Sequence, residues 1–457
     1  TGASITLTTT TASALNVTNT TIGSAGLTFR SVSSAGGSSP GIVLSATGNL
    51  GGLTVTGTGA ATTGGTIEGK SGNGILLSGT RGVSLTSMRI RNNLGSGIAG
   101  DDVTNFSLIS STVTDNADTT GGTEAGLRFD ELLGTCAITN STVSGSVEDN
   151  IRLTSASGVL TDLAISGSTI GPNNALTGGS GLAIVTTGSA AVTVNITGST
   201  FTGNRASGIL TSLGSNGAHE INVSTTNFQT HNTAIDLGLD FDADLTFDVS
   251  NNTNIVGNTA NAINIVSGTT TTNSARLRGT IDGNTIGSGA VDSGSTNAFG
   301  IAVDLRGDVD AVLSITNNTV RNTDIEGIFV QTRLDNDADA EIGLLDLTLR
   351  DNTVSAPDDN SAFPFGFVYG TRIESRNTSD VCMDISGNTS AGVGGAEHFR
   401  VRQRDTSTFR IERLALGSQS AATTQTFVAG QNDAGSTAST TVATSFTGVA
   451  NGTCRKP

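Results

Sequence analysis

The chain has 457 residues, of which 61 are Gly, only 5 are Pro and none is Trp. Its formal net charge of −16 argues against nucleic acid and anionic membrane surfaces as partners. It contains no apolar run of the roughly 18 residues that a membrane-spanning helix needs, so no such helix is predicted. Because neither an initiator Met nor a signal peptide is present, we expect a mature, processed or excised chain.

Residues 1–26 are rich in Thr and Ser, and their sparse apolar residues alternate as β-strands require. Parallel solenoids usually shield their first coil with a cap, and none is recognisable here. We therefore expect upstream residues or another chain to cover this end. The segment could extend the first coil, or it could act as an inter-subunit strand in a head-to-tail filament.

Residues 27–395 repeat one short pattern, which reads ITNSTV at 138–143 and ITNNTV at 315–320. Each copy places a small polar residue, called the pivot below, between apolar residues, and successive pivots lie 26 to 36 residues apart. A fixed motif at loosely fixed spacing predicts a solenoid whose coils differ only in their turns. The pivots are Ser111, Ser141, Ser168, Ser199, Thr226, Asn252, Asn284, Asn318, Asn352 and Asn388.

The apolar residues five and three positions before each pivot share one face of a strand and should point inward. Val194 and Ile196 illustrate the pair, and Gly279 breaks the first column once. Each pivot can hydrogen-bond backbone in the bend and stack on its counterpart one coil away. A second apolar column, which includes Ile301, follows a small residue that we expect to allow a sharp corner or positive φ. The pattern predicts an all-β, parallel β-helix of about fourteen coils.

These repeats resemble the right-handed parallel β-helix of the pectate-lyase-like superfamily. Within it, they are most similar to the Thr-, Gly- and Asn-rich repeat proteins that bacteria place on or outside the cell. The resemblance covers roughly residues 20–395 and implies a right-handed β-solenoid. It implies no particular activity, because the same coils serve enzymes, adhesins and passive stalks.

Residues 396–457 depart from the repeat and predict a β-rich C-terminal cap. Segments 397–405 and 406–416 alternate charge and hydrophobicity as a hairpin would, and 424–435 could hold a short helix.

The three cysteines differ in the face they occupy. Cys136 lies in the inward column, Cys382 should point outward, and Cys454 is in the tail. We expect a Cys382–Cys454 disulfide that joins the cap to the last coil, and an extracellular or cell-surface location; two free thiols are the alternative.

Acidic runs follow several of the second-column strands and give weak candidate ligands for Ca²⁺, the one cofactor that the sequence suggests. They include Asp240, Asp242, Asp244, Asp308, Asp310, Asp335, Asp337 and Asp339. Their spacing fits no known calcium loop, so a solvated acidic flank is the competing interpretation.

The predicted function is a non-catalytic, extracellular structural β-solenoid. It would be a cell-surface stalk, an adhesin or a head-to-tail filament subunit, with itself or cell-surface and matrix glycans as partners. The alternative is a polysaccharide lyase or glycoside hydrolase acting on acidic polysaccharide, in which Arg306 or Arg333 could serve a lyase. The scattered histidines, His219, His231 and His398, argue against a hydrolase site.

Overall fold

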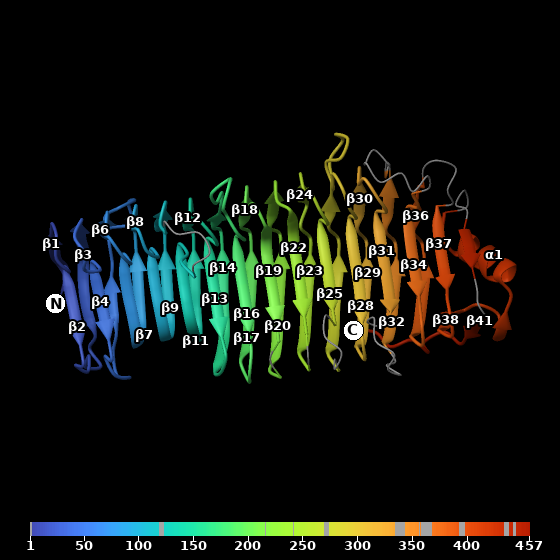
Figure 1. Cartoon of the computed structure of the whole chain (residues 1–457), viewed down its shortest axis with the longest axis horizontal. Helices are drawn as coiled ribbons and strands as arrows, with labels where there is room; N and C mark the ends of the chain where they lie inside the picture. Colours follow the sequence, from blue (N-terminus) through green and yellow to red (C-terminus); the bar gives the residue numbers. More distant parts are fainter. Residues whose placement is uncertain are drawn as a thin grey trace. The chain divides into compact units, whose positions relative to one another are not determined.

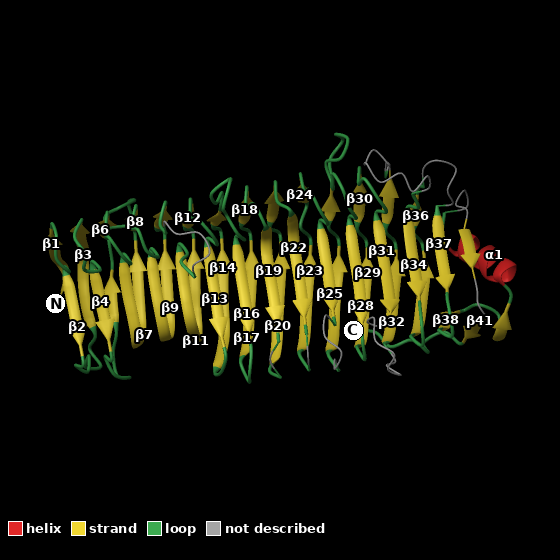
Figure 2. Cartoon of the chain, in the orientation of Figure 1, coloured by secondary structure: helices red, strands yellow, loops and turns green. Residues whose placement is uncertain are grey.

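A computed structural model describes residues 2–117, 123–214, 216–240, 242–268, 274–333, 343–355, 357, 368–392, 398–433, 438–441 and 445–457. The chain divides into two compact units, unit 1 (Thr1–Leu210) and unit 2 (Thr211–Pro457), which are treated separately below. Both consist of short strands that are almost all parallel, joined by short loops, and the described residues contain a single helix (Figure 1, Figure 2). The predicted all-β, right-handed parallel β-helix is confirmed.

Unit 1 contains eighteen complete strands. They are β1 (Gly2–Thr9), β2 (Leu15–Thr18), β3 (Leu27–Ala35), β4 (Ile42–Ser45), β5 (Leu53–Val55), β6 (Gly65–Glu68), β7 (Ile75–Thr86), β8 (Met88–Arg91), β9 (Ile98–Ile109), β10 (Thr112–Thr114), β11 (Leu127–Thr139), β12 (Thr142–Ser144), β13 (Ile151–Ser155), β14 (Val159–Ser166), β15 (Thr169–Ile170), β16 (Leu182–Thr186), β17 (Ala191–Thr197) and β18 (Thr200–Thr202). The boundary between the units falls within β19 (Ser207–Leu213).

Unit 2 contains the remaining strands and the helix. They are β20 (Ala218–Ser224), β21 (Asn227–Gln229), β22 (Thr233–Leu239), β23 (Asp244–Ser250), β24 (Asn254–Val256), β25 (Ile263–Ser267), β26 (Arg276–Asp282), β27 (Thr285–Ile286), β28 (Ile301–Arg306), β29 (Asp310–Thr316), β30 (Thr319–Arg321), β31 (Ile328–Arg333), β32 (Leu344–Arg350), β33 (Thr353–Ser355), β34 (Thr371–Ser375), β35 (Asp380–Ser386), β36 (Thr389–Ser390), β37 (Phe399–Gln403), β38 (Thr408–Glu412), β39 (Gly417–Gln419), α1 (Ala421–Gln431), β40 (Ala438–Thr441) and β41 (Phe446–Val449).

The predicted inward columns form the core of each unit. In unit 1, Ile75, Ile98 and Leu127 pair in register across β7, β9 and β11 and are fully buried. In unit 2, Ile263 and Ile301 do the same across β25 and β28. Fully burying such a side chain contributes about 1.5–3 kcal/mol, so the repeated columns dominate the stability of each coil.

The gap at Gly279 is filled from the neighbouring coil. A Cβ atom at Gly279 would lie 2.1 Å from the ring of Phe247, its in-register partner on β23. The same exchange occurs in unit 1, where a Cβ at Gly100 would lie 2.3 Å from the ring of Phe129. A large side chain on one coil thus occupies the space that glycine leaves on the next, and the core stays close-packed.

Positive φ occurs at a different place from the one predicted. At the described positions the small residue before the second column has ordinary φ, and Gly97 has no room for a side chain because a Cβ there would lie 2.6 Å from the Gly126 carbonyl oxygen. The residue with left-handed backbone conformation is instead the one that precedes each pivot, for example Ser110, Asn251 and Asn317. In all ten copies the φ angle of this preceding residue lies between 48° and 70°. Gly, Asn and Asp tolerate this conformation, which explains the polar residues of the motif.

Strand pairing bears on two predictions about the ends of the repeat, and the inter-subunit role of segment 1–26 stays a prediction. Segment 1–26 forms part of unit 1, because β1 and β2 pair in parallel with β3 and β4. The hairpin predicted at 397–416 is wrong: β37 and β38 pair in parallel with β34 and β35, and so continue the coils. The helix α1 follows, and β39 pairs with β41 in antiparallel fashion. No described helix is long and apolar enough to span a membrane.

Candidate functional site

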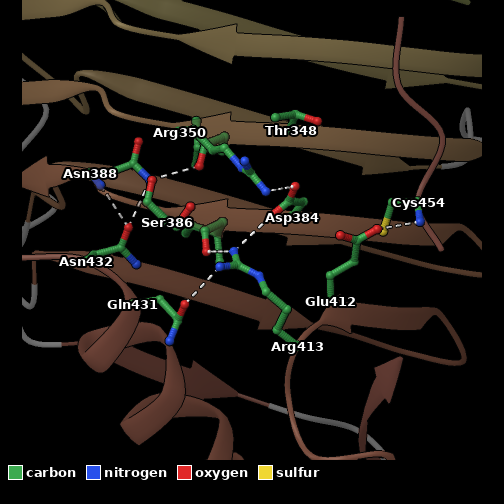
Figure 3. A network of polar contacts seen from close by, with 12 residues as sticks. Thr348, Arg350, Asp384, Ser386, Asn388, Glu412, Arg413, Gln431, Asn432 and Cys454 are labelled. Atoms are coloured by element: carbon green, nitrogen blue, oxygen red, sulfur yellow. Dashed lines mark hydrogen bonds and ion pairs between the residues drawn. The ribbon is translucent and has the colours of Figure 1, made fainter. Parts of the chain in front are cut away.

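The polar pivots of unit 2 form a ladder of hydrogen bonds that ends at α1. The Oδ1 atom of each asparagine pivot accepts a hydrogen bond from the backbone N–H of the preceding pivot. From Asn284 onward, Oδ1 also accepts from the side-chain Nδ2 of the preceding asparagine. Asn352, for example, accepts from both the N–H and the Nδ2 of Asn318, each at 3.0 Å. The last rung is Asn432, the residue after α1, whose Oδ1 accepts from the N–H and Nδ2 of Asn388 (Figure 3). Asn432 Nδ2 donates to the Val428 carbonyl, so the ladder also holds the end of the helix.

Beside this ladder, a disulfide joins Cys382 on β35 to Cys454 in the C-terminal tail, with 5.4 Å between their Cα atoms. Cys382 occupies an outward strand position, yet it is fully buried because the tail covers it. Cys136 is the free, buried cysteine, and burial raises the pKa of its thiol to about 11. Because the thiolate is the reactive form and the raised pKa keeps Cys136 protonated, this thiol is a poor nucleophile.

The residue after Cys454 binds two coils at once. Arg455 donates from Nε to Asp346 on β32 at 2.5 Å, and from its NH2 to Asp310 on β29 at 2.6 Å. Its backbone N–H donates to the same Asp346, at 3.0 Å. These hydrogen bonds raise the pKa of Arg455 and hold the pKa of Asp310 below its usual range against the opposing effect of burial. The tail therefore runs back across the coils, and its last residues contact β29, β32 and β35; Figure 1 marks the C-terminus in this part of the chain.

Asp384 on β35 is the centre of the remaining contacts. Its carboxylate is buried and is met by Lys456 Nζ at 2.5 Å, Arg350 at 2.5 Å and Arg413 at 2.9 Å. Burial alone would raise its pKa, but the hydrogen bonds and charges of Lys456 and Arg350 outweigh it and lower the pKa. Figure 3 shows Asp384 beside Arg350 and Arg413, and Arg413 in turn reaches Gln431 at the end of α1.

We call these contacts the clasp: the Cys382–Cys454 disulfide, the ion pairs of Arg455 and Lys456, and the bonds from Arg413. Glu412 completes it by accepting from the Cys454 backbone N–H at 2.7 Å. Through Cys454, Arg455 and Lys456, the clasp joins the tail to side chains of β29, β32 and β35 that are 72 to 145 residues away in sequence. Among described residues, the only three potential metal ligands found together are Asp346, Cys382 and Cys454, and both sulfurs are already bonded to each other.

The acidic residues proposed as calcium ligands are spread over separate contacts. Asp310 binds Arg278 and Arg455, Asp244 binds Arg276 at 3.4 Å, and Asp242 accepts from the Ser274 hydroxyl. Asp240 lies in the loop between β22 and β23, and Asp308 lies in the loop between β28 and β29. Asp335, Asp337 and Asp339 fall outside the described residues. Calcium binding on this flank stays a prediction.

The arginines considered for a lyase are held by one carboxylate. Asp304 on β28 accepts from Nε and NH2 of both Arg306 and Arg333, at 2.7–3.0 Å, and from Gln331 at 3.1 Å. Burial opposes its charge, yet these bonds lower the pKa of Asp304. Arg333 therefore binds both carboxylate oxygens of Asp304, whereas both N–H groups of Arg306 bind Oδ2.

The histidines lie on separate coils. His219 on β20 is buried, and its desolvation lowers its pKa to about 4. His231 is buried in the turn position that Asn116 and Asn204 occupy in unit 1. His398 precedes β37.

Sequence reasoning identified the disulfide but missed the ionic half of the clasp. The signal was present: the chain has only two lysines, and one of them follows Arg455 directly after the tail cysteine. What the sequence lacked was the register that places Asp310, Asp346 and Asp384 on neighbouring coils.

Comparison with known proteins supports the fold and goes no further. Residues 40–229 match the family model described as the right-handed β-helix region. No curated protein and no solved structure matches the chain. Together with the parallel pairing of the strands in each unit, the family match identifies the chain as a right-handed parallel β-helix repeat protein.

Proposed function

We propose that this protein is an extracellular structural β-solenoid, the shaft of a cell-surface stalk or adhesin or a filament subunit, and that it catalyses no reaction. The observation that carries the proposal is the clasp. A disulfide and the ion pairs of Arg455 and Lys456 are devoted to fixing the end of the chain onto earlier coils. Disulfides persist in oxidising compartments outside the cell, which supports the location.

The clasp gives the proposal a mechanical basis. Tension applied to the C-terminus enters the coils through Cys454 and Cys382, so the residues between them lie outside the load path. That segment holds α1 and the strands β36 to β41, the least repetitive part of unit 2. A shaft that transmits force benefits from such a bypass, whereas an enzyme has no need of it.

The alternative, an enzyme acting on acidic polysaccharide, has less support among the described residues. A hollow of about 380 Å³ in unit 1 is lined by one acid, Asp102, together with Arg81 and Thr80. A second hollow, of about 280 Å³, contains Asp346 and Asp380, but Arg455 and Arg410 already bind these two carboxylates. A glycosidase needs two carboxyl groups free to act as acid and as base or nucleophile.

Force spectroscopy of the oxidised and reduced protein tests the structural role. With the disulfide intact, the segment between the cysteines, which are 72 positions apart, should stay hidden from extension. Reduction should add about 250 Å of contour length, at roughly 3.5 Å per residue, and this segment should be released first.

Incubation with pectin or alginate tests the alternative, and release of unsaturated uronides or reducing ends would overturn our proposal.

A further inference from the structure

Three potential metal ligands meet where the tail crosses the coils of unit 2. Asp346 on β32 and Cys382 on β35 pair directly in register, so they occupy the same outward column. Cys454 reaches them from the tail, and one carboxylate oxygen and the two sulfurs all lie within 4.8 Å of one another. All three side chains are buried. The sulfurs form a disulfide in this structure, and its reduction would free both of them as ligands.

Contacts on both sides of Cys454 position the tail independently of the disulfide. The Cys454 N–H donates to Glu412 at 2.7 Å. The Arg455 N–H and Nε donate to Asp346 at 3.0 and 2.5 Å. None of these bonds needs the S–S link, so they bias the reduced tail toward the same position. Two thiols and a carboxylate are thus held near one another, which lowers the entropy cost of closing a metal site.

Arg455 also prepares Asp346 as a ligand. Its hydrogen bonds leave each carboxylate oxygen with a further lone pair, so the carboxylate can bind a metal ion while Arg455 fixes its orientation. The guanidinium also offsets charge, because two thiolates and a carboxylate bring three negative charges to a divalent ion.

A second carboxylate beside the sulfurs favours a cation. Glu412 is buried, and its Oε2 atom has no hydrogen-bond partner among the described residues. Figure 3 shows this carboxylate next to Cys454. Glu412 is not one of the three grouped ligands, so its contribution is the attraction of a buried negative charge for a nearby positive ion.

A hollow gives the group a route to solvent. It has a volume of about 280 Å³, and its lining includes Asp346 together with Thr453 and Arg455, the residues on either side of Cys454. A reductant and a metal ion can therefore approach from this side. The hollow also has room for a water molecule, which occupies about 30 Å³ in the liquid.

The ligand set selects the class of metal. Thiolates are soft ligands that favour Zn²⁺ and similar ions, whereas Ca²⁺ and Mg²⁺ take oxygen ligands. Two thiolates and a carboxylate supply three positions of a tetrahedral Zn²⁺ site, and a water molecule from the hollow can supply the fourth. We propose that, when the disulfide is reduced, Cys382, Cys454 and Asp346 bind one Zn²⁺ ion, which then joins the tail to β32 and β35 in place of the covalent bond.

Two balanced steps lead to this site. A trialkylphosphine breaks the S–S bond: the phosphine is oxidised to its oxide with oxygen from water, and each sulfur gains one proton. Zn²⁺ then displaces these two protons as the Zn–S bonds form. The oxidised protein has no thiol at this place and should bind no Zn²⁺ here. Zinc binding by the reduced clasp is independent of the proposed structural function, which concerns the oxidised protein.

Cobalt titration tests the site. A chain that carries Cys136→Ser is reduced with a phosphine and titrated with Co²⁺ in the absence of oxygen. We expect the near-ultraviolet absorption of thiolate-to-cobalt charge transfer to saturate at one Co²⁺ per chain, and Zn²⁺ to abolish it because similar sites bind Zn²⁺ more tightly. The oxidised chain should give no such band. Since Cys136 is the third of three cysteines, the remaining signal reports only the clasp.

Substitutions separate the ligands from their surroundings. Cys454→Ser should abolish the band, and Asp346→Asn should weaken Co²⁺ binding by more than about tenfold. The matched control is Asp380→Asn, because Asp380 lines the same hollow and is bound by Arg410 but is not one of the grouped ligands. It should bind Co²⁺ like the parent chain. All variants are compared in reduced form, so none lacks a cross-link that the parent has, and circular dichroism verifies that each is folded.

Alkylation of the otherwise unmodified chain tests whether the ion secures the tail. After reduction, iodoacetamide should modify Cys382 and Cys454, and one equivalent of Zn²⁺ should prevent both modifications. The buried Cys136 should stay unmodified with and without Zn²⁺, which excludes an effect of unfolding. Modification of the clasp cysteines at the same rate in the presence of Zn²⁺ would show that no metal binds them.

The titration can overturn the proposal in two further ways. A folded, reduced chain that gives no charge-transfer band would show that the clasp holds no metal. Unchanged affinity after Asp346→Asn would reject the carboxylate as a ligand, and with it the three-ligand site. The non-catalytic structural role would be unaffected by either result, because it is tested by turnover and by force.

Discussion

The two units use different side chains for the same turn. In unit 1 the pivots are serines, and Ser168 Oγ accepts one N–H, from Ser141 at 3.1 Å, while donating to the carbonyl of Ser166. In unit 2 most are asparagines, and Asn318 Oδ1 accepts both the N–H and the Nδ2 of Asn284 at 3.0 Å. An amide can accept and donate within the ladder at once, whereas the serine hydroxyls link to one another only through backbone.

The second difference lies in charge. Three of the described ion pairs belong to unit 1, and fourteen belong to unit 2, including those of the clasp. Unit 1 therefore depends on apolar columns and backbone pairing, whereas unit 2 adds charges and a covalent bond. The units should respond differently to reductant, to acid and to pivot substitutions.

Loss of the disulfide should have the largest effect. Replacing Cys454 by Ser reopens a 72-residue loop in the unfolded chain and should lower the stability of unit 2 by about 4 kcal/mol. Urea unfolding measured under non-reducing conditions checks the value. The comparison variant is Cys136→Ser in unit 1, which should alter unit 1 and leave unit 2 unchanged. Equal stability of unit 2 with and without the bond would contradict the role given to the clasp.

Acid should loosen unit 2 next. The pKa of His219 is lowered to about 4 in the folded state and is about 6.5 when unfolded. The unfolded chain thus binds more protons between these values, and stability should fall by up to about 3 kcal/mol as pH drops from about 6.5 to about 4. Below that range, protonation of Asp310, Glu374 and Asp384, whose pKa values are lowered, should remove further stability.

Unit 1 provides the control for this prediction. Its buried Cys136 has a pKa raised to about 11, so its contribution to stability changes only on the alkaline side. Urea midpoints measured from pH 4 to pH 7 should therefore vary for unit 2, and His219→Gln should flatten the dependence. A profile that His219→Gln leaves unchanged would assign the acid response to other groups.

Pivot substitutions should have a smaller effect that differs between the units. Asn318→Ala removes the acceptor of two donors and should destabilise unit 2 by about 2–3 kcal/mol. Ser168→Ala removes the acceptor of one donor and should destabilise unit 1 by about 1 kcal/mol. Thermal unfolding, monitored by hydrogen exchange in peptides from each unit, measures the loss of stability caused by each substitution. Similar losses would mean that the second amide bond contributes little.

An exchange of pivots gives the finest test. Asn318→Ser keeps an acceptor for the Asn284 N–H but loses the amide-to-amide bond, so it should destabilise unit 2 by only about 1 kcal/mol. If this variant were as unstable as Asn318→Ala, the ladder would depend on the size of the side chain and not on its hydrogen bonds.

Much of the fold could be predicted because the information is local. The period-2 alternation before each pivot and the spacing of pivots along the chain predict the parallel coils. The alternation in 397–405 and 406–416 is equally clear, but it predicts a hairpin as readily as two further coils, because sequence alone does not say which strands β37 and β38 pair with.

The same limit applies to the sites. The outward position of Cys382 could be predicted, but its complete burial could not, because it depends on where the tail lies. The ion pairs of Arg455 and the in-register pair of Asp346 and Cys382 depend on loop lengths that vary from coil to coil. Contacts between coils follow from register, and register is a property of the assembled solenoid.

Hydrogen exchange on reduction tests the central claim most directly, which is that the clasp secures the C-terminal coils of unit 2. The intact protein is labelled with and without a dithiol reductant, and peptides are compared by mass spectrometry. We predict that reduction speeds exchange in β38, β41 and α1, and to a lesser degree in β35, while β9 and β11 of unit 1 keep their protection. Unchanged exchange throughout unit 2, with the disulfide shown to be reduced, would contradict the account.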